Sequence, residues 1–175
     1  MSEIIFLTGG RCEPIEDKAV KVFEDKDMVT YLCTNIIGYQ RGEKLRYLES
    51  SSHSHWRTRN SFDLDLDNID TDDCKLFILS SVSDWIYRLI EREPDNYDDE
   101  YFIKRVEVEL LRLIKDVRDA DGSFIIISRD VSRSVYPENK KERLEQVVIG
   151  AINCFIADIA DTVAMYEFGR PRVIK

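Results

Sequence analysis

The sequence is 175 residues long and carries 34 Asp and Glu against 25 Lys and Arg, a formal net charge of −9. Such a surface repels nucleic-acid backbones and anionic lipid headgroups, so we expect no nucleic-acid and no membrane partner. No apolar run approaches the roughly 20 residues that cross a bilayer, and no basic region precedes the first apolar stretch. These features predict a single cytoplasmic domain over residues 1–175.

The cysteines are widely spaced and form no C-x-x-C pair. They are Cys12, Cys33, Cys74 and Cys154. Zinc sites and redox pairs usually need closer spacing. The spacing therefore favours reduced thiols in a cytosolic protein.

An aspartate-rich stretch between Asp63 and Asp73 places oxygen ligands at alternating positions, which suggests calcium. An EF-hand loop that started at Asp63 would need glycine at its sixth position and glutamate at its twelfth. This chain has Asn68 and Cys74 there. A solvated loop before the next strand is the better interpretation.

Short β-rich runs alternate with longer helical patterns. The predicted strands are Ile4–Leu7, Val29–Cys33, Lys75–Leu79, Ser123–Ser128 and Thr162–Tyr166. Several are almost entirely apolar, as strands buried on both faces should be. This alternation predicts an α/β fold with a mostly parallel sheet covered by helices on both faces.

Three long helices are predicted from apolar residues that recur every three or four positions. They cover Val82–Arg92, about Glu100–Asp119 and about Lys140–Ala160. Asn139 is a candidate N-cap for the last helix, and Gly122 is a candidate stop for the one before it.

The turn after the first strand is the first place to look for a ligand, because α/β sheets bind ligands at the carboxyl ends of their strands. It opens with Thr8, Gly9, Gly10 and Arg11, like the start of a phosphate-binding P-loop. A working P-loop reads G-x-x-x-x-G-K-[ST]. Counted from Gly9, the last three positions hold Pro14-Ile15-Glu16.

These replacements remove each group that binds a triphosphate. Proline has no N–H to donate. The lost lysine contact is worth roughly 1.5–3 kcal/mol. Glu16 and Asp17 place negative charge there instead, and Lys18 comes three residues late, on the expected helix. The alternative is an ordinary strand-to-helix turn whose acidic residues suit the positive end of the helix dipole.

Five segments match the motifs of one known family in order and at similar spacing. They are Ile4–Gly10, Val29–Thr34, His55–Thr58, Ile78–Ile90 and Ser128–Asn139. The last is the best, because it keeps Asp130, Val131 and Pro137-Glu138-Asn139. The sequence resembles the bifunctional adenosylcobinamide kinase / adenosylcobinamide-phosphate guanylyltransferase family over nearly its whole length.

The resemblance implies a P-loop NTPase-like three-layer sandwich, commonly assembled as a trimer. Family members phosphorylate adenosylcobinamide and then attach GMP through a guanylylated histidine, both for cobalamin biosynthesis. If activity is retained, GTP or ATP and magnesium are the implied cofactors. A corrinoid or nucleotide is the implied ligand, and a homo-oligomer or a hetero-oligomer with an intact homologue is the implied assembly.

The nucleotide-accepting histidine is missing from its family position, about eight residues before the tryptophan of the third segment. This chain has Leu48 there, and leucine cannot form a phosphoramidate. A shift of five residues would make His53 a replacement nucleophile. The alternative is that His53 and His55 are exposed in a serine-rich turn.

Other family positions form a candidate cleft. They are Thr34, Ser80, Arg129, Asp130 and Arg133. Ser80 stands where the family has an acidic residue near magnesium, and Arg129 replaces an asparagine. Arg129 and Arg133 could bind an anion bidentately, or they could form salt bridges with the many carboxylates.

Three functions remain open from the sequence. The first is a degenerate, non-catalytic relative that binds a ligand or a partner enzyme. The second is an active corrinoid kinase or nucleotidyltransferase with a rebuilt site. The third is an interaction protein that uses the fold only for assembly, since a fold alone does not determine function.

Overall fold

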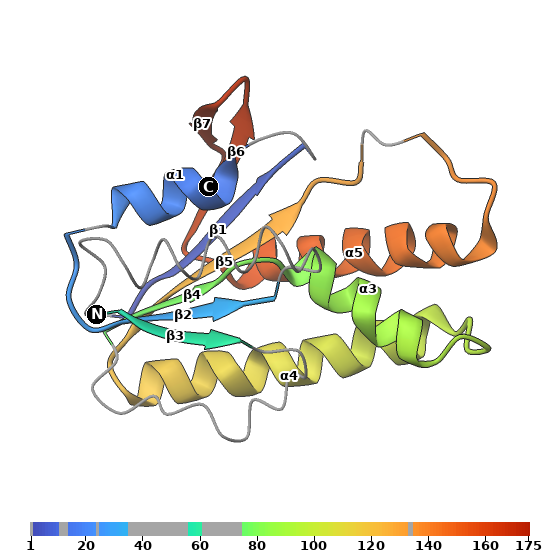
Figure 1. Ribbon diagram of the computed structural model, residues 1–175, viewed down its shortest axis with the longest axis horizontal. Coiled ribbons are helices and arrows are strands. Elements are labelled where there is room, and N and C mark those ends of the chain that lie inside the picture. Colours follow the sequence, from blue (N-terminus) through green and yellow to red (C-terminus); the bar gives the residue numbers. More distant parts are fainter. Residues whose placement is uncertain (1, 11–13, 24, 35–55, 61–74, 133–134) are drawn as a thin grey trace.

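The computed structural model describes residues 2–10, 14–23, 25–34, 56–60, 75–132 and 135–175. Figure 1 shows their arrangement. In chain order the elements are β1 (Ile4–Gly9), α1 (Ile15–Val22), β2 (Val29–Cys33), β3 (Arg57–Asn60), β4 (Leu76–Leu79), α3 (Val82–Arg92), α4 (Asp99–Asp119), β5 (Ser123–Arg129), α5 (Lys140–Ile159), β6 (Thr162–Glu167) and β7 (Arg170–Val173).

The strands form one sheet in the order β3-β2-β4-β5-β1-β6-β7. Strands β1 to β6 are parallel, and β7 runs antiparallel beside β6. Because the six parallel strands point the same way, their carboxyl ends share one edge of the sheet. This carboxyl edge contains most of the described cleft candidates.

The predicted strands are all confirmed, with ends within two residues of the prediction. Two edge strands were not predicted. β3 reads Arg-Thr-Arg-Asn and β7 reads Arg-Pro-Arg-Val, so neither has the apolar pattern of a buried strand. Both are strands because they pair with a neighbouring strand, and such pairing cannot be deduced from the residues of one short segment.

The helices cover both faces of the sheet (Figure 1). On β1, Ile4 and Phe6 point into the larger apolar cluster, which they share with α3, α4 and α5. Leu7 points the other way, into a smaller cluster with Ile15 and Ala19 of α1. Alternate residues of each central strand thus serve opposite layers, as the period of two requires.

Helix ends follow the expected chemistry, with one correction. The side chains of Ser81, Asp98 and Asn139 each accept a backbone N–H bond and cap α3, α4 and α5. The left-handed residue after α4 is Asp121, at φ 55°, and not Gly122. Gly122 is the next residue of the same C-terminal cap, and its N–H donates to the carbonyl of Val117 at 2.9 Å.

Strand β7 forms a protected sheet edge. The N–H of Ile174 donates to the carbonyl of Val163 at 2.8 Å, so alternate residues of this segment point their N–H groups toward β6. Pro171 falls in the other set, which faces away. Its missing N–H removes a donor from the open edge and discourages pairing with another chain.

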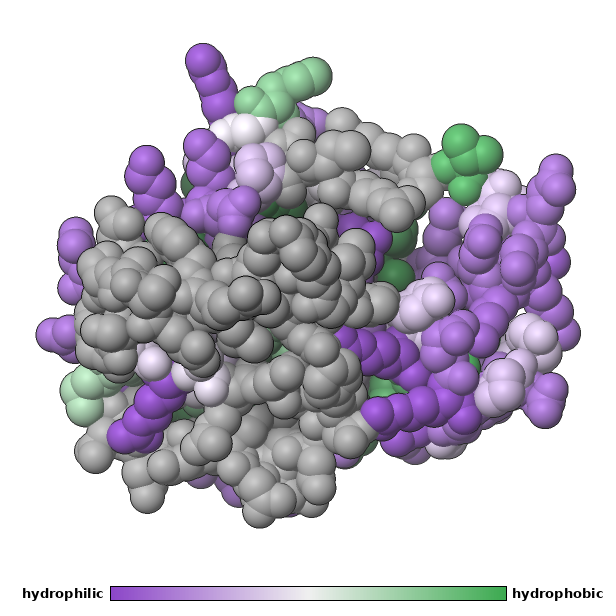
Figure 2. Space-filling model, viewed as in Figure 1, coloured by the Kyte–Doolittle hydropathy of each residue, from purple (hydrophilic) through white to green (hydrophobic). Residues whose placement is uncertain are grey.

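The described part of the face in Figure 2 is largely hydrophilic. Figure 2 shows hydrophilic side chains over the ends of α3, α4 and α5, with isolated apolar patches among them. Of the cysteines, Cys33 is buried and Cys154 is exposed, while Cys12 and Cys74 lie outside the described residues. Within the described ranges, no helix has the length and apolar character needed to span a membrane.

Lys175 caps α5 from a distance. The last turn of this helix contains no basic residue, yet the Nζ of Lys175 donates to the carbonyls of Asp158 at 2.9 Å and Ala157 at 3.3 Å. A cation at this end of a helix satisfies terminal carbonyls and opposes the helix dipole. The C-terminal residue thereby joins α5 to the outer part of the sheet.

Replacing Lys175 by methionine keeps the aliphatic stem and removes the ammonium group. We expect the free energy of unfolding to fall by about 0.5–1 kcal/mol, because the last carbonyls of α5 lose a cationic donor. Urea unfolding followed by circular dichroism measures the change. Lys104→Met is the control, since Lys104 is exposed on α4. Equal stability of the two variants would contradict this role.

Candidate functional site

The candidate residues come together at the carboxyl edge of the sheet. Thr8 and Gly9 end β1, Thr34 follows β2, Ser80 follows β4 and Arg129 ends β5. Gly10 and Asp130 each follow one of these strands directly. Arg11, His53 and Arg133 lie outside the described residues, as do Leu48 and the aspartate-rich stretch, so what the sequence indicates for them stays a prediction.

The first βα turn leads into α1 without a side-chain cap. Pro14 occupies the N-cap position, and its carbonyl accepts the N–H of Lys18 at 3.0 Å. Lys18 is exposed on the helix, as predicted. Glu16 and Asp17 lie in the first turn of α1, where the helix dipole favours negative charge.

Ile15 stands where a P-loop has its lysine, and it is a core residue. Its side chain is 5% exposed and belongs to the apolar cluster with Leu7 and Ala19. A Cβ built on Gly9 would lie 2.9 Å from the Cδ1 of Ile15 and 2.9 Å from the carbonyl oxygen of Tyr166. The side chain therefore packs against the end of β1.

Glu16 stands where a P-loop has its magnesium-binding hydroxyl. Its Oε1 accepts a hydrogen bond from the hydroxyl of Tyr31, which reaches it from β2. Tyr31 is completely buried, so the bond satisfies a phenol that water cannot reach. No sequence signal singled out Tyr31, because it lies inside an apolar strand.

A buried hydroxyl network joins the ends of β2 and β4. The N–H of Thr34 donates to the Oγ of Ser80 at 2.9 Å. The hydroxyl of Thr34 donates to the carbonyl of Ser81 at 2.7 Å and lies 2.9 Å from the Ser81 nitrogen, whose N–H it accepts. Three residues of two strand ends are thus locked together, and all three are buried.

Arg129 forms an ion pair across the end of β5. Its guanidinium binds the carboxylate of Asp84 and donates through Nε to the hydroxyl of Ser83 at 3.3 Å. Both partners lie in the first turn of α3. Of the two interpretations of Arg129, the salt bridge is confirmed. Its partner Asp84 carried no signal in the sequence.

The loop after β5 is tied to β1 and α5. The N–H of Asp130 donates to the carbonyl of Gly9 at 2.8 Å, and its Oδ1 accepts the N–H of Ser132 at 2.8 Å. The side-chain amide of Asn153 donates to the carbonyl of Arg129 at 2.7 Å. These bonds place the start of the loop directly beside the first βα turn.

Glu145 of α5 is half-buried among charged groups of α3 and α5. Burial, followed by repulsion from Glu142 and Glu91, raises its pKa from the ordinary 4.5 to about 7, against the opposing effects of Lys141 and Arg129. Lys141 is paired with Glu91 at 2.6 Å. In the part of the chain that is described, no cluster of three or more His, Cys, Asp or Glu side chains could hold a metal.

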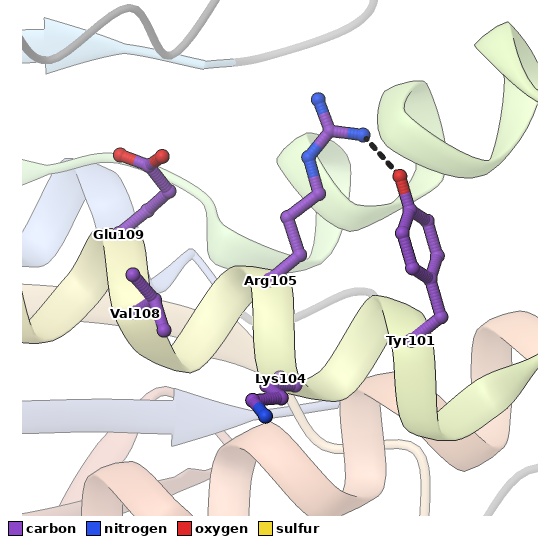
Figure 3. A pocket seen from close by; sticks show the side chains of 5 residues that line it. All are labelled: Tyr101, Lys104, Arg105, Val108 and Glu109. Carbon is purple, nitrogen blue, oxygen red and sulfur yellow. Dashed lines mark hydrogen bonds between the residues drawn. The ribbon is translucent and has the colours of Figure 1, made fainter.

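A shallow depression lies elsewhere, on the outer face of α4. Its volume is about 260 Å³, and it is lined by Tyr101, Lys104, Arg105, Val108 and Glu109. Figure 3 shows the guanidinium of Arg105 turned toward the hydroxyl of Tyr101, 3.3 Å away. All five lining residues belong to one helix, and none of them lies at the carboxyl edge.

Replacing Gly9 by alanine tests the packing of the first βα turn. The new methyl group would press on Ile15 and the Tyr166 backbone, so we expect the free energy of unfolding to fall by about 1–3 kcal/mol. Gly10→Ala is the matched control, because a Cβ there meets nothing within 4 Å. Denaturant unfolding compares them, and an equal effect of both changes would refute the close contact.

Replacing Glu145 by glutamine tests its surroundings through pH. Between its unfolded pKa near 4.5 and its folded pKa of about 7, Glu145 holds a proton mainly in the folded state. Its contribution to stability therefore falls as pH rises through this range. We expect Glu145→Gln to exceed the parent in urea midpoint at pH 8 and to match it near pH 4.5.

The control for this change is Glu138→Gln, in the exposed loop before α5. The difference in urea midpoint between Glu138→Gln and the parent should not rise in the same way between pH 4.5 and pH 8. A Glu145→Gln variant whose advantage stays constant from pH 4.5 to pH 8 would show that the burial of Glu145 does not perturb its titration.

Known proteins share both the sequence pattern and the fold of this chain. The sequence model of the family described as cobinamide kinase / cobinamide phosphate guanyltransferase matches residues 16–174. The chain is 22% identical to the bifunctional adenosylcobalamin biosynthesis protein CobU of Salmonella typhimurium (strain LT2), over 95% of this chain and 96% of that protein. It is 21% identical to the Escherichia coli (strain K12) protein of the same name, with the same coverage.

Among solved structures, the chain resembles the KaiC-like protein PH0186 of Pyrococcus horikoshii OT3. The TM-score is 0.53 at 12% identity, over 93% of this chain and 70% of the other. This likeness and the sheet order confirm the P-loop NTPase-like α/β sandwich. The match of the family model over most of the sequence shows that the chain belongs to the cobinamide kinase / cobinamide phosphate guanyltransferase family.

Proposed function

We propose that this chain is a degenerate member of its family. It lacks the standard kinase and guanylyltransferase activities and acts as a binding or regulatory partner in cobalamin biosynthesis. The observation that carries the proposal is the position of Ile15, which lies in the apolar core where a P-loop would extend a lysine toward phosphate.

The chemistry of this turn opposes a bound triphosphate. An isoleucine cannot replace the charge-assisted contact of a lysine, which is worth roughly 1.5–3 kcal/mol. Pro14 offers no N–H to a phosphate oxygen. Glu16 is a carboxylate and is already bound to Tyr31. The described residues of the turn therefore do not fit a magnesium nucleotide held in the P-loop manner.

The guanylyltransferase activity needs a histidine nucleophile, which the sequence does not have at the family position. Leu48 stands at the position of the nucleotide-accepting histidine, and it forms no phosphoramidate. His53 is the candidate acceptor that a shift of five residues would put in its place. We therefore assign no catalytic residue to the proposed function.

The proposed partner is a corrinoid, a nucleotide held in another manner, or an intact homologue in the cytoplasm. Assembly as a homo-oligomer or as a hetero-oligomer with that homologue would preserve the fold without requiring chemistry from this subunit. The polar carboxyl edge, with the Arg129–Asp84 pair and the Thr34–Ser80 network, is the surface that we expect to contact a ligand.

The alternative is an active corrinoid kinase or nucleotidyltransferase with a rebuilt site. The polar residues at the carboxyl edge favour it, because ligands of α/β sheets bind at this edge. It requires a phosphate-binding group from outside the first βα turn. Arg11 and Arg133 are the candidates for that role, and His53 is the candidate nucleophile.

A thermal-shift measurement separates the two proposals. We expect no change in the melting temperature of the parent with ATP or GTP and magnesium. A ligand at about a hundred times its dissociation constant stabilises by about 2.7 kcal/mol, a shift of several degrees. The matched variant is Pro14→Gly, Ile15→Lys and Glu16→Ser combined, which restores the P-loop residues and should gain a nucleotide-dependent shift. A magnesium-dependent shift in the parent itself would support the rebuilt site.

A labelling experiment tests the guanylyltransferase step directly. After incubation with radiolabelled GTP, the protein is denatured in alkaline detergent, which preserves a phosphorus–nitrogen bond. We expect no label on the parent. Label that is lost in His53→Ala and kept in His55→Ala would identify a working nucleophile and reject the degenerate assignment.

A further inference from the structure

Three buried oxygen atoms near the ends of β1 and β5 have no hydrogen-bond partner among the described residues. They are the Oγ1 of Thr8, the Oγ of Ser128 and the Oδ1 of Asn153. Thr8 is 8% exposed and Ser128 is 1% exposed. Buried polar atoms nearly always have a partner, because leaving one unpaired costs its full desolvation penalty.

The three side chains come from neighbouring positions in the fold. Thr8 and Ser128 are direct neighbours in the register of β1 and β5. Both lie on the face of the sheet that packs against α5, as the alternation from Phe6 and Ile126 requires. Asn153 of α5 donates to the carbonyl of Arg129, the residue next to Ser128.

The hydrogen-bonding capacities of these side chains are complementary. Each hydroxyl can donate one hydrogen and accept others, whereas the Oδ1 of Asn153 can only accept. One water molecule can accept from one hydroxyl, donate to the second hydroxyl and donate to the amide oxygen. Buried water typically makes about three such bonds.

We propose that Thr8, Ser128 and Asn153 bind a single buried water that joins β1, β5 and α5. This water lies next to the bond between the N–H of Asp130 and the carbonyl of Gly9. The water therefore holds the end of β1, before the first βα turn, and the end of β5, before the loop that follows it. Its binding does not depend on whether the chain binds nucleotide.

The sign of a stability change tests the proposal. Thr8→Val and Ser128→Ala each remove one partner of the water, so each should lower the folding equilibrium constant about fivefold or more. The matched control is Thr30→Val, because the hydroxyl of Thr30 is also buried and unpaired but its register neighbour on β4 is Phe77. Thr30→Val should leave the urea midpoint unchanged or raise it.

The double variant provides a second readout. Two groups that share one water should show coupling, so the combined loss in Thr8→Val/Ser128→Ala should be smaller than the sum of the single losses. If Thr8→Val and Ser128→Ala are as harmless as Thr30→Val, or if their effects simply add, the shared water is refuted.

A high-resolution crystal structure of the unmodified protein gives a test that does not depend on folding of the variants. We expect density for one ordered water within hydrogen-bond distance of all three oxygens. Direct bonds between the three side chains, with no density between them, would overturn the proposal.

Discussion

The position of β1 between β5 and β6 constrains the rest of the structure. A strand with parallel neighbours on both sides has both of its faces covered by helices, so its side chains must serve two apolar layers. Phe6 faces α3, α4 and α5, while Leu7 faces α1. Because β6 lies directly beside β1, there is no room for a side chain at Gly9, where a Cβ would meet the backbone of Tyr166.

This constraint explains why the carboxyl edge is polar. Where the strands end, backbone groups leave the sheet and require partners that the apolar layers cannot supply. Thr34, Ser80 and Ser81 satisfy one another at the ends of β2 and β4, and Ser83, Asp84 and Arg129 do so at the end of β5. The edge that could receive a ligand is thus also the place where the fold satisfies its own polar groups.

The start of α1, by contrast, packs into the apolar core. Ile15 extends the core to the start of α1, and the bond between Glu16 and Tyr31 holds the helix against β2. A phosphate-binding loop needs the opposite arrangement, with free N–H groups and a positive side chain at the surface. The degenerate site that we propose is compatible with family membership, because packing alone can maintain the architecture.

The sequence by itself determined the layers of this protein. Apolar strands, helical periodicity and the cap at Asn139 are local features, so they could be interpreted without knowing the fold. The motif spacing also identified the family, and counting from Gly9 placed Pro14, Ile15 and Glu16 at the last three P-loop positions. These features could be read from the chain because each depends on residues that are near one another in it.

Only the tertiary structure decided which side chains meet. The partners of Arg129, Glu16 and Asn153 are 45, 15 and 24 residues away, and no periodicity reports such pairs. The edge strands β3 and β7 could be identified only from their pairing with a neighbouring strand, because their sequences contain few apolar residues. Contacts between distant residues arise from packing of the whole chain, and for that reason the environment of the candidate site could not be deduced from sequence alone.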